Sequence, residues 1–231
     1  MSRFVDWHEN GSYSCTGTCF DIGNTVRAAL AVFKRTGKPM AGSTDPQAAG
    51  NGALMRLSPV AIRYLADRPK MREVAALQTR TTHGATEAVE ASVLFAEILA
   101  DAIAGKPRSE VLAARPGSFS PKIQAIASGA SWRGRHRDDI SGTGYVVDCL
   151  NAALWAVSRT AGFRSAVLLA ANLGQDADTT AAVAGQLAGA LYGASGIPED
   201  WLAKLAWRER IEETAGRLFA RVDKRSRGDA W

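Results

Sequence analysis

Cysteine is scarce in this chain of 231 residues, which carries only Cys15, Cys19 and Cys149. An odd number of cysteines without a secretory context argues against a framework of disulfides. Cys15 and Cys19 have the spacing of a metal-binding pair, but no second pair of cysteines or histidines lies nearby to complete a zinc site. The sequence therefore favours neither a disulfide-rich fold nor a zinc module.

Long apolar runs are also missing. The most apolar stretch, residues 166–193, is interrupted at its centre by Asp176 and Asp178, so we expect no helix that spans a bilayer and no membrane partner. The first residues, MSRFVDWHENG, lack the apolar core of a signal peptide, and we expect a cytoplasmic location. The remaining composition, 46% hydrophobic and 22% charged, is that of a globular protein with a substantial core.

The net charge of +5 raises the question of a nucleic-acid partner. Basic residues gather in 132-WRGRHRDD-139 and in 221-RVDKRSRGDAW-231. Both clusters contain acids, and neither is interleaved with aromatic residues that would stack on bases. We expect a solvated loop, a solvated tail and no nucleic-acid partner.

Segments of alternating β-branched residues are almost absent, and helical periodicity dominates. One predicted helix opens at Asn24 or Thr25 and stops at Gly37, and another is capped by Thr86 and stops at Gly105. Further helices are predicted over 145–161 and 202–222. With no long linker or fixed repeat, the sequence predicts an all-α fold with helices packed through their alanines, forming a single domain over residues 1–231.

The stretch 172-NLGQDADTTAAVAGQLAGALYG-193 places acids and hydroxyls at the start of a small-residue helix. Its glycines, at intervals of four, indicate close helix packing. Asp176, Asp178 and Thr179 fit an ordinary helix N-terminus, where carboxylates are favoured. They also fit an oxygen-only cluster for a hard divalent cation such as Mg²⁺, which would partner buried acids.

The segment 50-GNGALMR-56 predicts a loop before a helix. Its backbone N–H groups and the Asn51 amide suit an anionic or hydroxyl-rich ligand, and Arg56 offers a forked donor to phosphate. The same letters also describe a plain turn.

Two further positions are candidates for ligand contact. His83, in 79-TRTTHGATEA-88, precedes a glycine at an open position, although surface or capping histidines look the same. Tyr145 follows the glycines of 141-SGTG-144, where its ring would cover a base or a sugar or pack in the core. His8 and His136 have no convincing partners.

The order of these motifs along the chain, from about Trp7 to Trp201, closely resembles that of the ADP-ribosylglycohydrolase family. The resemblance implies an orthogonal all-α fold and hydrolysis of the glycosidic bond that joins ADP-ribose to a modified side chain, so an ADP-ribosylated protein or small ADP-ribosyl compound is the implied substrate. It also implies two Mg²⁺ or Mn²⁺ ions, with Asp176, Asp178 and Thr179 as ligands and with Asp178, then Asp176, as catalytic candidates. The implied substrate-binding residues are Gly50, Asn51, Gly52, Ala53, Leu54, Met55, Arg56, His83 and Tyr145.

One departure from the family pattern stands out. Family members carry a Thr-Asp-Asp-Thr motif near the N-terminus, which supplies the other half of the metal site, and this sequence has none. Three interpretations stay open: a start codon assigned too late, a member that binds ADP-ribose without cleaving it, or ligands supplied by another subunit. Without those carboxylates we expect weaker binding of at least one ion and a slower reaction.

Overall fold

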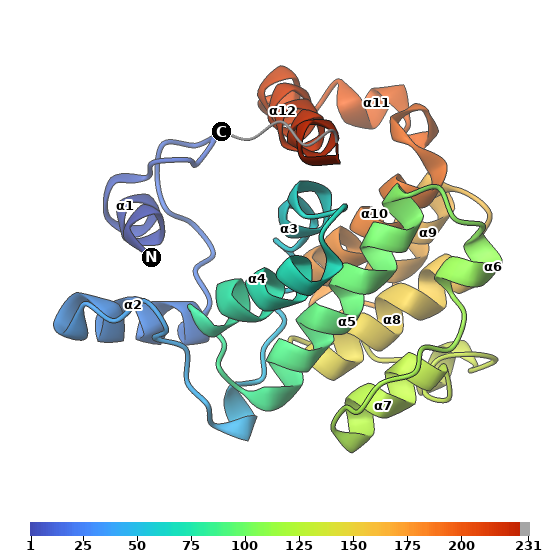
Figure 1. Ribbon diagram of the computed structural model, residues 1–231, viewed down its shortest axis with the longest axis horizontal. Helices are drawn as coiled ribbons and strands as arrows, with labels where there is room; N and C mark the ends of the chain where they lie inside the picture. The colour runs from blue at the N-terminus through green and yellow to red at the C-terminus, as the bar shows by residue number, and fades with distance from the viewer. Residues whose placement is uncertain (227–231) are drawn as a thin grey trace.

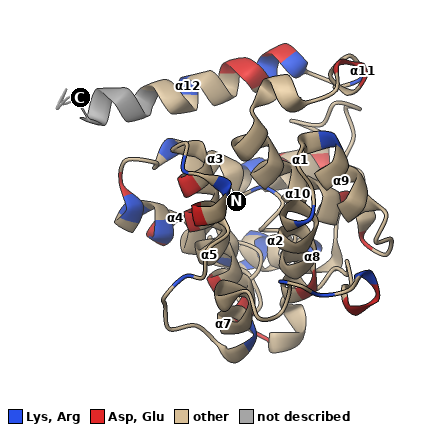
Figure 2. Cartoon of the chain, turned by 90° about the vertical axis from the view of Figure 1, so that its right-hand side faces the viewer, with Lys and Arg blue, Asp and Glu red and all other residues tan. Residues whose placement is uncertain are grey.

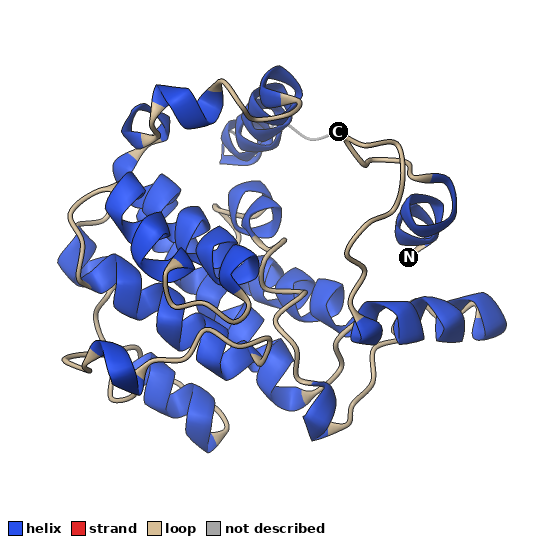
Figure 3. Cartoon of the chain, turned by 180° about the vertical axis from the view of Figure 1, so that it is seen from behind, coloured by secondary structure: helices blue, strands red, loops and turns tan. Residues whose placement is uncertain are grey.

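Helices account for nearly all regular structure in the computed structural model, which describes residues 1–226 (Figures 1 and 3). Within these residues there is no strand, and the only β pairing consists of two isolated bridges, Ser43–His83 and Gly50–Tyr145. The all-α prediction is therefore confirmed. The helices are α1 (Ser2–Asn10), α2 (Asn24–Thr36), α3 (Ser58–Arg63), α4 (Arg68–Arg80), α5 (Thr86–Ile103), α6 (Arg108–Val111), α7 (Pro121–Ser128), α8 (Val146–Ser158), α9 (Phe163–Ala171), α10 (Ala177–Tyr192), α11 (Glu199–Leu202) and α12 (Arg208–Ser226), with 3-10 turns η1 (Pro46–Ala48), η2 (Arg137–Asp139) and η3 (Ala194–Gly196).

The helix α5 lies at the centre of the molecule and is enclosed by α3, α4, α6, α7, α8 and α10 (Figure 1). The helical periodicity of its sequence places Val89 and Ile98 on or near one apolar face, and both are buried. Ser92 and Asp101 are buried as well, because a central helix is covered on several sides at once. The hydrophobic core is therefore built around the whole circumference of α5 and not along a single stripe.

The helices α8, α9 and α10 pack on one another beside α5. Helical periodicity within the predicted span 145–161 places five residues of α8 inward, and all are buried: Val146, Leu150, Ala153, Leu154 and Val157. On α10, a side chain added at Gly185 would meet Val167 of α9, and one added at Gly189 would meet Phe163. The predicted role of these glycines in close packing is confirmed, because they face the neighbouring helix at van der Waals distance.

The predicted helix over 202–222 is wrong in its boundaries. The chain forms a short α11, a turn over 203–207, and then α12. Trp207 has a backbone φ of 59°, in the left-handed region, so it cannot continue a right-handed helix. α12 packs on α3, and Figure 2 shows acidic and basic residues together along it at the top of the view. The side chains of the basic tail predicted at 221–231 lie outside the described residues.

The predicted cap of α5 is also wrong. Ala85 takes the N-cap position, and no side chain caps the helix. At α2, Gly23 takes the N-cap position and no side chain caps the helix, so the predicted cap at Asn24 or Thr25 is wrong. Its predicted end is confirmed: Gly37 ends the helix with a φ of 70°, a conformation that glycine adopts without strain. Among residues 1–226, no helix combines the length and apolar character needed to cross a membrane.

Candidate active site

Two loops that are far apart in the sequence lie side by side at the candidate site. The N–H of Asn51 donates to the carbonyl of Gly144 at 3.0 Å, and the N–H of Val146 donates to the carbonyl of Ala49 at 2.9 Å. A β-bridge joins Gly50 to Tyr145 between them. The predicted loop at 50–56 and the predicted glycine segment before α8 therefore form one unit.

The start of α10 joins the same unit through Asp176. Asp176 occupies the N-cap position, yet its side chain makes no capping hydrogen bond to the helix. Its Oδ2 instead accepts a hydrogen bond of 2.7 Å from the amide of Asn51, and its N–H donates to the carbonyl of Gly142 at 2.9 Å. Asn51 is buried, with 7% of its surface exposed. The ordinary-cap interpretation of Asp176 is therefore wrong, because its carboxylate is turned toward the other motif.

Asp178 and Thr179 lie in the first turn of α10, as the sequence predicted. Thr179 is half-buried, but Asp178 is exposed. Within residues 1–226, the carboxylate of Asp178 makes no hydrogen bond or ion pair with another side chain. The expectation that these acids are buried together is therefore wrong: only Asp176 is partly withdrawn from solvent.

The backbone before Asp176 is unusual. Gly174 and Gln175 both have positive φ, at 78° and 59°. Left-handed backbone costs free energy at a residue other than glycine, and such strain is concentrated at functional sites. This strained turn places the Asp176 carboxylate next to the Asn51 amide, at the start of α10.

The donor set at the start of α10 suits a hard cation in kind. Asp176, Asp178 and Thr179 present only oxygen atoms, which Mg²⁺ and Mn²⁺ prefer. Among the residues that the structure describes, no cluster of three or more His, Cys, Asp or Glu side chains is placed to hold a metal. The chain thus offers part of a metal shell, and Mg²⁺ commonly completes its shell with water and substrate oxygens.

His83 is buried, with 2% of its surface exposed, so the expected open position is wrong. Its Nδ1 lies 2.8 Å from the hydroxyl of Thr82, and a side chain added at Gly50 or Gly52 would meet its ring at 3.2 or 3.0 Å. Burial, and then the positive charge of Arg56, lower the pKa of His83 to about 4. His83 is therefore a neutral side chain that packs behind the loop, and a Cβ at either glycine would be in tight contact with its ring.

Arg56 does not point its guanidinium outward. Its Nη1 donates to the carbonyl of Gly52 at 2.9 Å, its Nη2 to the hydroxyl of Thr82 at 2.8 Å, and its Nε to the side chain of Gln78 at 3.2 Å. The ring of Phe4 covers the guanidinium at 4.9 Å. Burial lowers the pKa of Arg56 to about 10, so it stays charged at neutral pH. In this arrangement Arg56 stabilises the loop from its buried side, and its guanidinium is not placed to donate a bidentate pair of hydrogen bonds to a phosphate.

The remaining loop residues divide into two kinds. The side chains of Ala53 and Leu54 are buried in the core, whereas Met55 is 45% exposed. Within the described part of the chain, no acceptor bonds the N–H groups of Gly52 and Ala53, whereas those of Gly50 and Asn51 are used internally. Gly52 is half-buried and Ala53 is 1% exposed, so the loop offers a ligand the N–H of Gly52 and the Met55 side chain.

Sequence reasoning missed the residues that hold these loops. Gln186 of α10 accepts from the N–H of Ser58 at 2.8 Å and donates to the carbonyls of Leu54 and Met55 at 3.1 and 3.2 Å. The hydroxyl of Thr143 donates to Asp148 at 2.7 Å. Gln186 lies in the segment 172–193 and Thr143 in the segment 141–144. The polar type of these two side chains was the only sign in the sequence that they hold the loops.

Cys149 is buried beneath the site, where its sulfur lies 3.9 Å from the hydroxyl of Thr180. Burial raises the pKa of its thiol to about 11. A thiol with this pKa stays protonated and does not act as a nucleophile.

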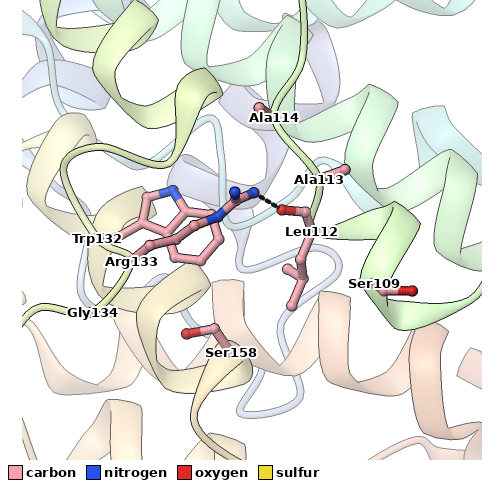
Figure 4. A pocket seen from close by; sticks show the side chains of 8 residues that line it. All are labelled: Ser109, Leu112, Ala113, Ala114, Trp132, Arg133, Gly134 and Ser158. Atoms are coloured by element: carbon pink, nitrogen blue, oxygen red, sulfur yellow. Dashed lines mark hydrogen bonds between the residues drawn. The ribbon is translucent and has the colours of Figure 1, made fainter.

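A separate pocket of about 410 Å³ lies between the turn at 132–134, the segment 112–114 and the end of α8 (Figure 4). Arg133 packs on the ring of Trp132 and donates to the carbonyl of Leu112 across it. None of the predicted site residues lines this pocket. The candidate site is therefore the junction of the three loops and not this pocket.

A family model described as ADP-ribosylglycohydrolase matches residues 1–228. The chain belongs to the ADP-ribosylglycohydrolase family. The resemblance of the motifs is thereby confirmed over nearly the whole sequence.

Two curated relatives of this chain are named ADP-ribosylarginine hydrolase Tri1. The one from Pseudomonas putida is 44% identical over 229 residues, covering 99% of this chain and 62% of the relative. The one from Serratia proteamaculans is 40% identical, covering 94% of this chain and 59% of the relative. The ADP-ribosyl-[dinitrogen reductase] glycohydrolase of Rhodospirillum rubrum is 31% identical over 187 residues, covering 80% of this chain and 60% of the relative. The chain thus spans about three fifths of the length of the curated relatives it matches.

A solved structure described as an ADP-ribosylglycohydrolase-related protein complex superimposes with a TM-score of 0.79. The match is 40% identical in sequence and covers 87% of this chain and 69% of the other. The fold of the family is therefore present in this chain.

Proposed function

We propose that this chain hydrolyses the bond between ADP-ribose and a modified side chain, with ADP-ribosylated arginine as the substrate. The observation that carries the proposal is the hydrogen bond of 2.7 Å between Asn51 and Asp176, which joins two motifs 125 residues apart. The two relatives at 44% and 40% identity, each named an ADP-ribosylarginine hydrolase, support arginine as the leaving group.

The residues present suit this chemistry. Cleavage at the anomeric carbon of ribose passes through a cationic, oxocarbenium-like transition state. Asp176 and Asp178 bring two carboxylates to the start of α10, where negative charge stabilises such a cation. Asp178, being exposed, is our first candidate to touch the attacking water, and Asp176 is held in place by Asn51.

The loops supply the groups that bind the ligand. The unpaired N–H group of Gly52, which is half-buried, is suited to the diphosphate, because backbone donors stabilise phosphate oxygens. Tyr145, half-buried beside Gly50, offers a ring for stacking. His83 and Arg56 contribute by holding the loop in shape.

We also propose that Mg²⁺ or Mn²⁺ takes part, held by Asp176, Asp178 and Thr179, since their oxygens suit either ion. When bound, the ion supplies polarisation of the ribose hydroxyls and of a nearby water. A cytoplasmic location belongs to the same proposal, since the three cysteines are free thiols, as a reducing compartment would leave them.

A second candidate function is binding of ADP-ribose without cleavage. The absence of a metal cluster with three or more such ligands among the described residues favours it, because a partial metal shell binds its ion more weakly. The two candidates share the binding loops and differ only in turnover.

The first experiment measures free ADP-ribose released from ADP-ribosylated arginine by the purified chain, with Mg²⁺ and with EDTA. Release that requires Mg²⁺ and disappears in Asp178→Asn supports the hydrolase. ADP-ribose affinity that persists in Asp178→Asn, with no release from any form, supports the binding function. Release that survives Asp178→Asn would show that our role for Asp178 is wrong.

A further inference from the structure

Three helices meet at the hydroxyl of Tyr145. The residue directly precedes α8, and its hydroxyl donates to Glu87 in the first turn of α5. Lys122, in the first turn of α7, donates to the same hydroxyl at 2.8 Å. Its ammonium also lies 3.7 Å from Glu87 and 5.0 Å from the centre of the Tyr145 ring. The hydroxyl is therefore bonded on both sides, once as donor and once as acceptor.

A second contact fixes the helix that carries Lys122. Glu90, three residues after Glu87 on α5, accepts hydrogen bonds from both the N–H and the hydroxyl of Ser120, at 2.8 and 2.6 Å. Ser120 is the residue directly before α7. Residues three apart lie on the same face of a helix, so one face of α5 anchors both the start of α7 and the Tyr145 ring.

The backbone of Tyr145 is tied to the other side of the site. It forms the β-bridge with Gly50, and its neighbour Gly144 accepts from Asn51. The ring is thus held at its hydroxyl by Glu87 and at its backbone by the loop that we assign to the ligand. A change in the χ1 angle of Tyr145, which would swing the ring and its hydroxyl away from α5, would break the bond to Glu87.

We propose that Glu87 and Lys122 are positioning residues that fix Tyr145 so that it meets an ADP-ribose ligand with one ring face and not with its hydroxyl. The proposal rests on the proposed function for its ligand, and on the contacts above for its geometry. Lys122 lies at the hydroxyl end of the ring, 2.8 Å from the hydroxyl and 5.0 Å from the ring centre, so it leaves a ring face for a stacked base or sugar. Because the Tyr145 hydroxyl donates its hydrogen bond to Glu87, it has no proton left to donate to the ligand.

Electrostatics supports this arrangement. Burial, and then the hydrogen bond to Glu87, raise the pKa of Tyr145 above its ordinary value of 10.0, while Lys122 acts in the opposite direction. Glu87 and Lys122 are the charged groups in contact with the hydroxyl. Their removal should therefore move the pKa of Tyr145 in opposite directions, which tests whether both groups contact the hydroxyl.

The test uses the whole chain and free ADP-ribose, with affinity measured by calorimetry. We expect Glu87→Ala to weaken ADP-ribose binding by about tenfold, the effect of losing one charged hydrogen bond. Glu87→Gln keeps an acceptor for the hydroxyl and should restore part of the affinity. Tyr145→Phe should behave like Glu87→Ala, and Tyr145→Ala should be weaker than both. Glu73→Ala, which breaks an exposed ion pair with Lys70 on α4, is the matched control and should bind as the unsubstituted chain does.

A second readout follows the phenol directly. With ¹³C-labelled tyrosine, the NMR signal missing in Tyr145→Phe identifies Tyr145, and its titration gives the pKa. We expect that pKa to fall in Glu87→Gln and to rise in Lys122→Ala. This measurement needs neither ligand nor catalysis.

The outcomes separate the two proposals. Unchanged affinity in Glu87→Ala, combined with weak binding in Tyr145→Ala, would overturn the positioning role. An unchanged titration in both charge variants would overturn the contacts themselves. No ADP-ribose binding by the unsubstituted chain would overturn the proposed function and the ligand half of this inference, while the titration still decides whether Glu87 and Lys122 fix the ring.

Discussion

At the scale of single residues, burial assigns roles that residue type leaves open. His83 and Arg56 are both polar residues in motifs that suggested ligand contact. His83 lies behind the loop against Gly50 and Gly52, and the donors of Arg56 are spent on Gly52, Gln78 and Thr82. Both side chains therefore hold the binding loop in its conformation.

The buried, neutral state of His83 predicts a pH dependence of stability. Its pKa is about 4 in the folded chain, against an ordinary value of 6.5. The stabilisation is present above pH 6.5 and is lost as the pH falls toward 4, because the unfolded chain takes up the proton first. We expect a loss of about 3 kcal/mol in the free energy of unfolding across this window.

Urea unfolding at several pH values checks this prediction. His83→Gln, which cannot take up a proton, should flatten the dependence between pH 6.5 and 4. His136→Gln, at an exposed position, should leave it as it is. An equal slope in His83→Gln and the unsubstituted chain would contradict the assignment.

At the scale of elements, single polar side chains fasten helices to loops. Gln186 is the clearest case, because one amide bonds three backbone groups between positions 54 and 58. Asp101 is a second: it is 6% exposed and pairs with Arg68, Lys106 and Arg115, which join α4, α5 and the segments around α6.

We expect Gln186→Ala to lower the free energy of unfolding by about 1–3 kcal/mol, because buried backbone groups lose their partners. It should also weaken ADP-ribose binding, since the loop at 50–56 loses its tie to α10. Gln47→Ala, at an exposed position in η1, is the control for both measurements. Full ADP-ribose affinity in Gln186→Ala would show that the loop keeps its shape without this tie.

Asp101 predicts a second, more acidic transition. Burial alone would raise its pKa, but Arg115, Lys106 and Arg68 outweigh burial and hold the pKa below its ordinary value of 3.8. The stability from this group is thus present above about pH 4 and is lost as the pH falls through the lowered pKa. Asp101→Asn should destabilise the chain by about 3–5 kcal/mol at neutral pH, because three cations lose their carboxylate.

The acid limb of the same urea series checks this prediction. The difference in stability between Asp101→Asn and the unsubstituted chain should shrink below pH 4. A difference that stays constant with pH would mean that the lost packing, and not the lost charge, explains the effect.

At the scale of the whole molecule, the core is continuous from Ala49 to Ala188. α12 lies outside that cluster but packs on α3. The single domain over residues 1–231 that the sequence predicts stays a prediction, and cooperative unfolding is its measurable consequence.

We therefore expect far-UV circular dichroism and tryptophan fluorescence to report the same urea midpoint. The probes sample different regions, since Trp132 and Trp155 are buried in the core and Trp207 is 41% exposed before α12. Phe95→Ala removes a buried side chain in the middle of α5 and leaves a cavity there. It should lower the free energy of unfolding by about 3–5 kcal/mol and shift the urea midpoints of both probes together. Two separate midpoints would divide the chain into two folding units.

Much of this protein is determined by its sequence. The all-α class, the end of α2 at Gly37 and the inward residues of α8 follow from periodicity and caps, because these are local properties of the chain. The order of the motifs likewise indicates the family, since it needs no knowledge of which residues touch. The position of Asp176 at the start of a helix belongs to the same group.

Only the tertiary structure decides what the side chains do. Contacts between distant segments bond the Asp176 carboxylate to Asn51 and bury His83. Such contacts also pair Tyr145 with Glu87 and Lys122. The closing of α10 onto the loop through Gln186 is another such contact. Residue type sets which bonds a side chain can form, but burial and the nearest partner select among them, and both depend on how the helices pack.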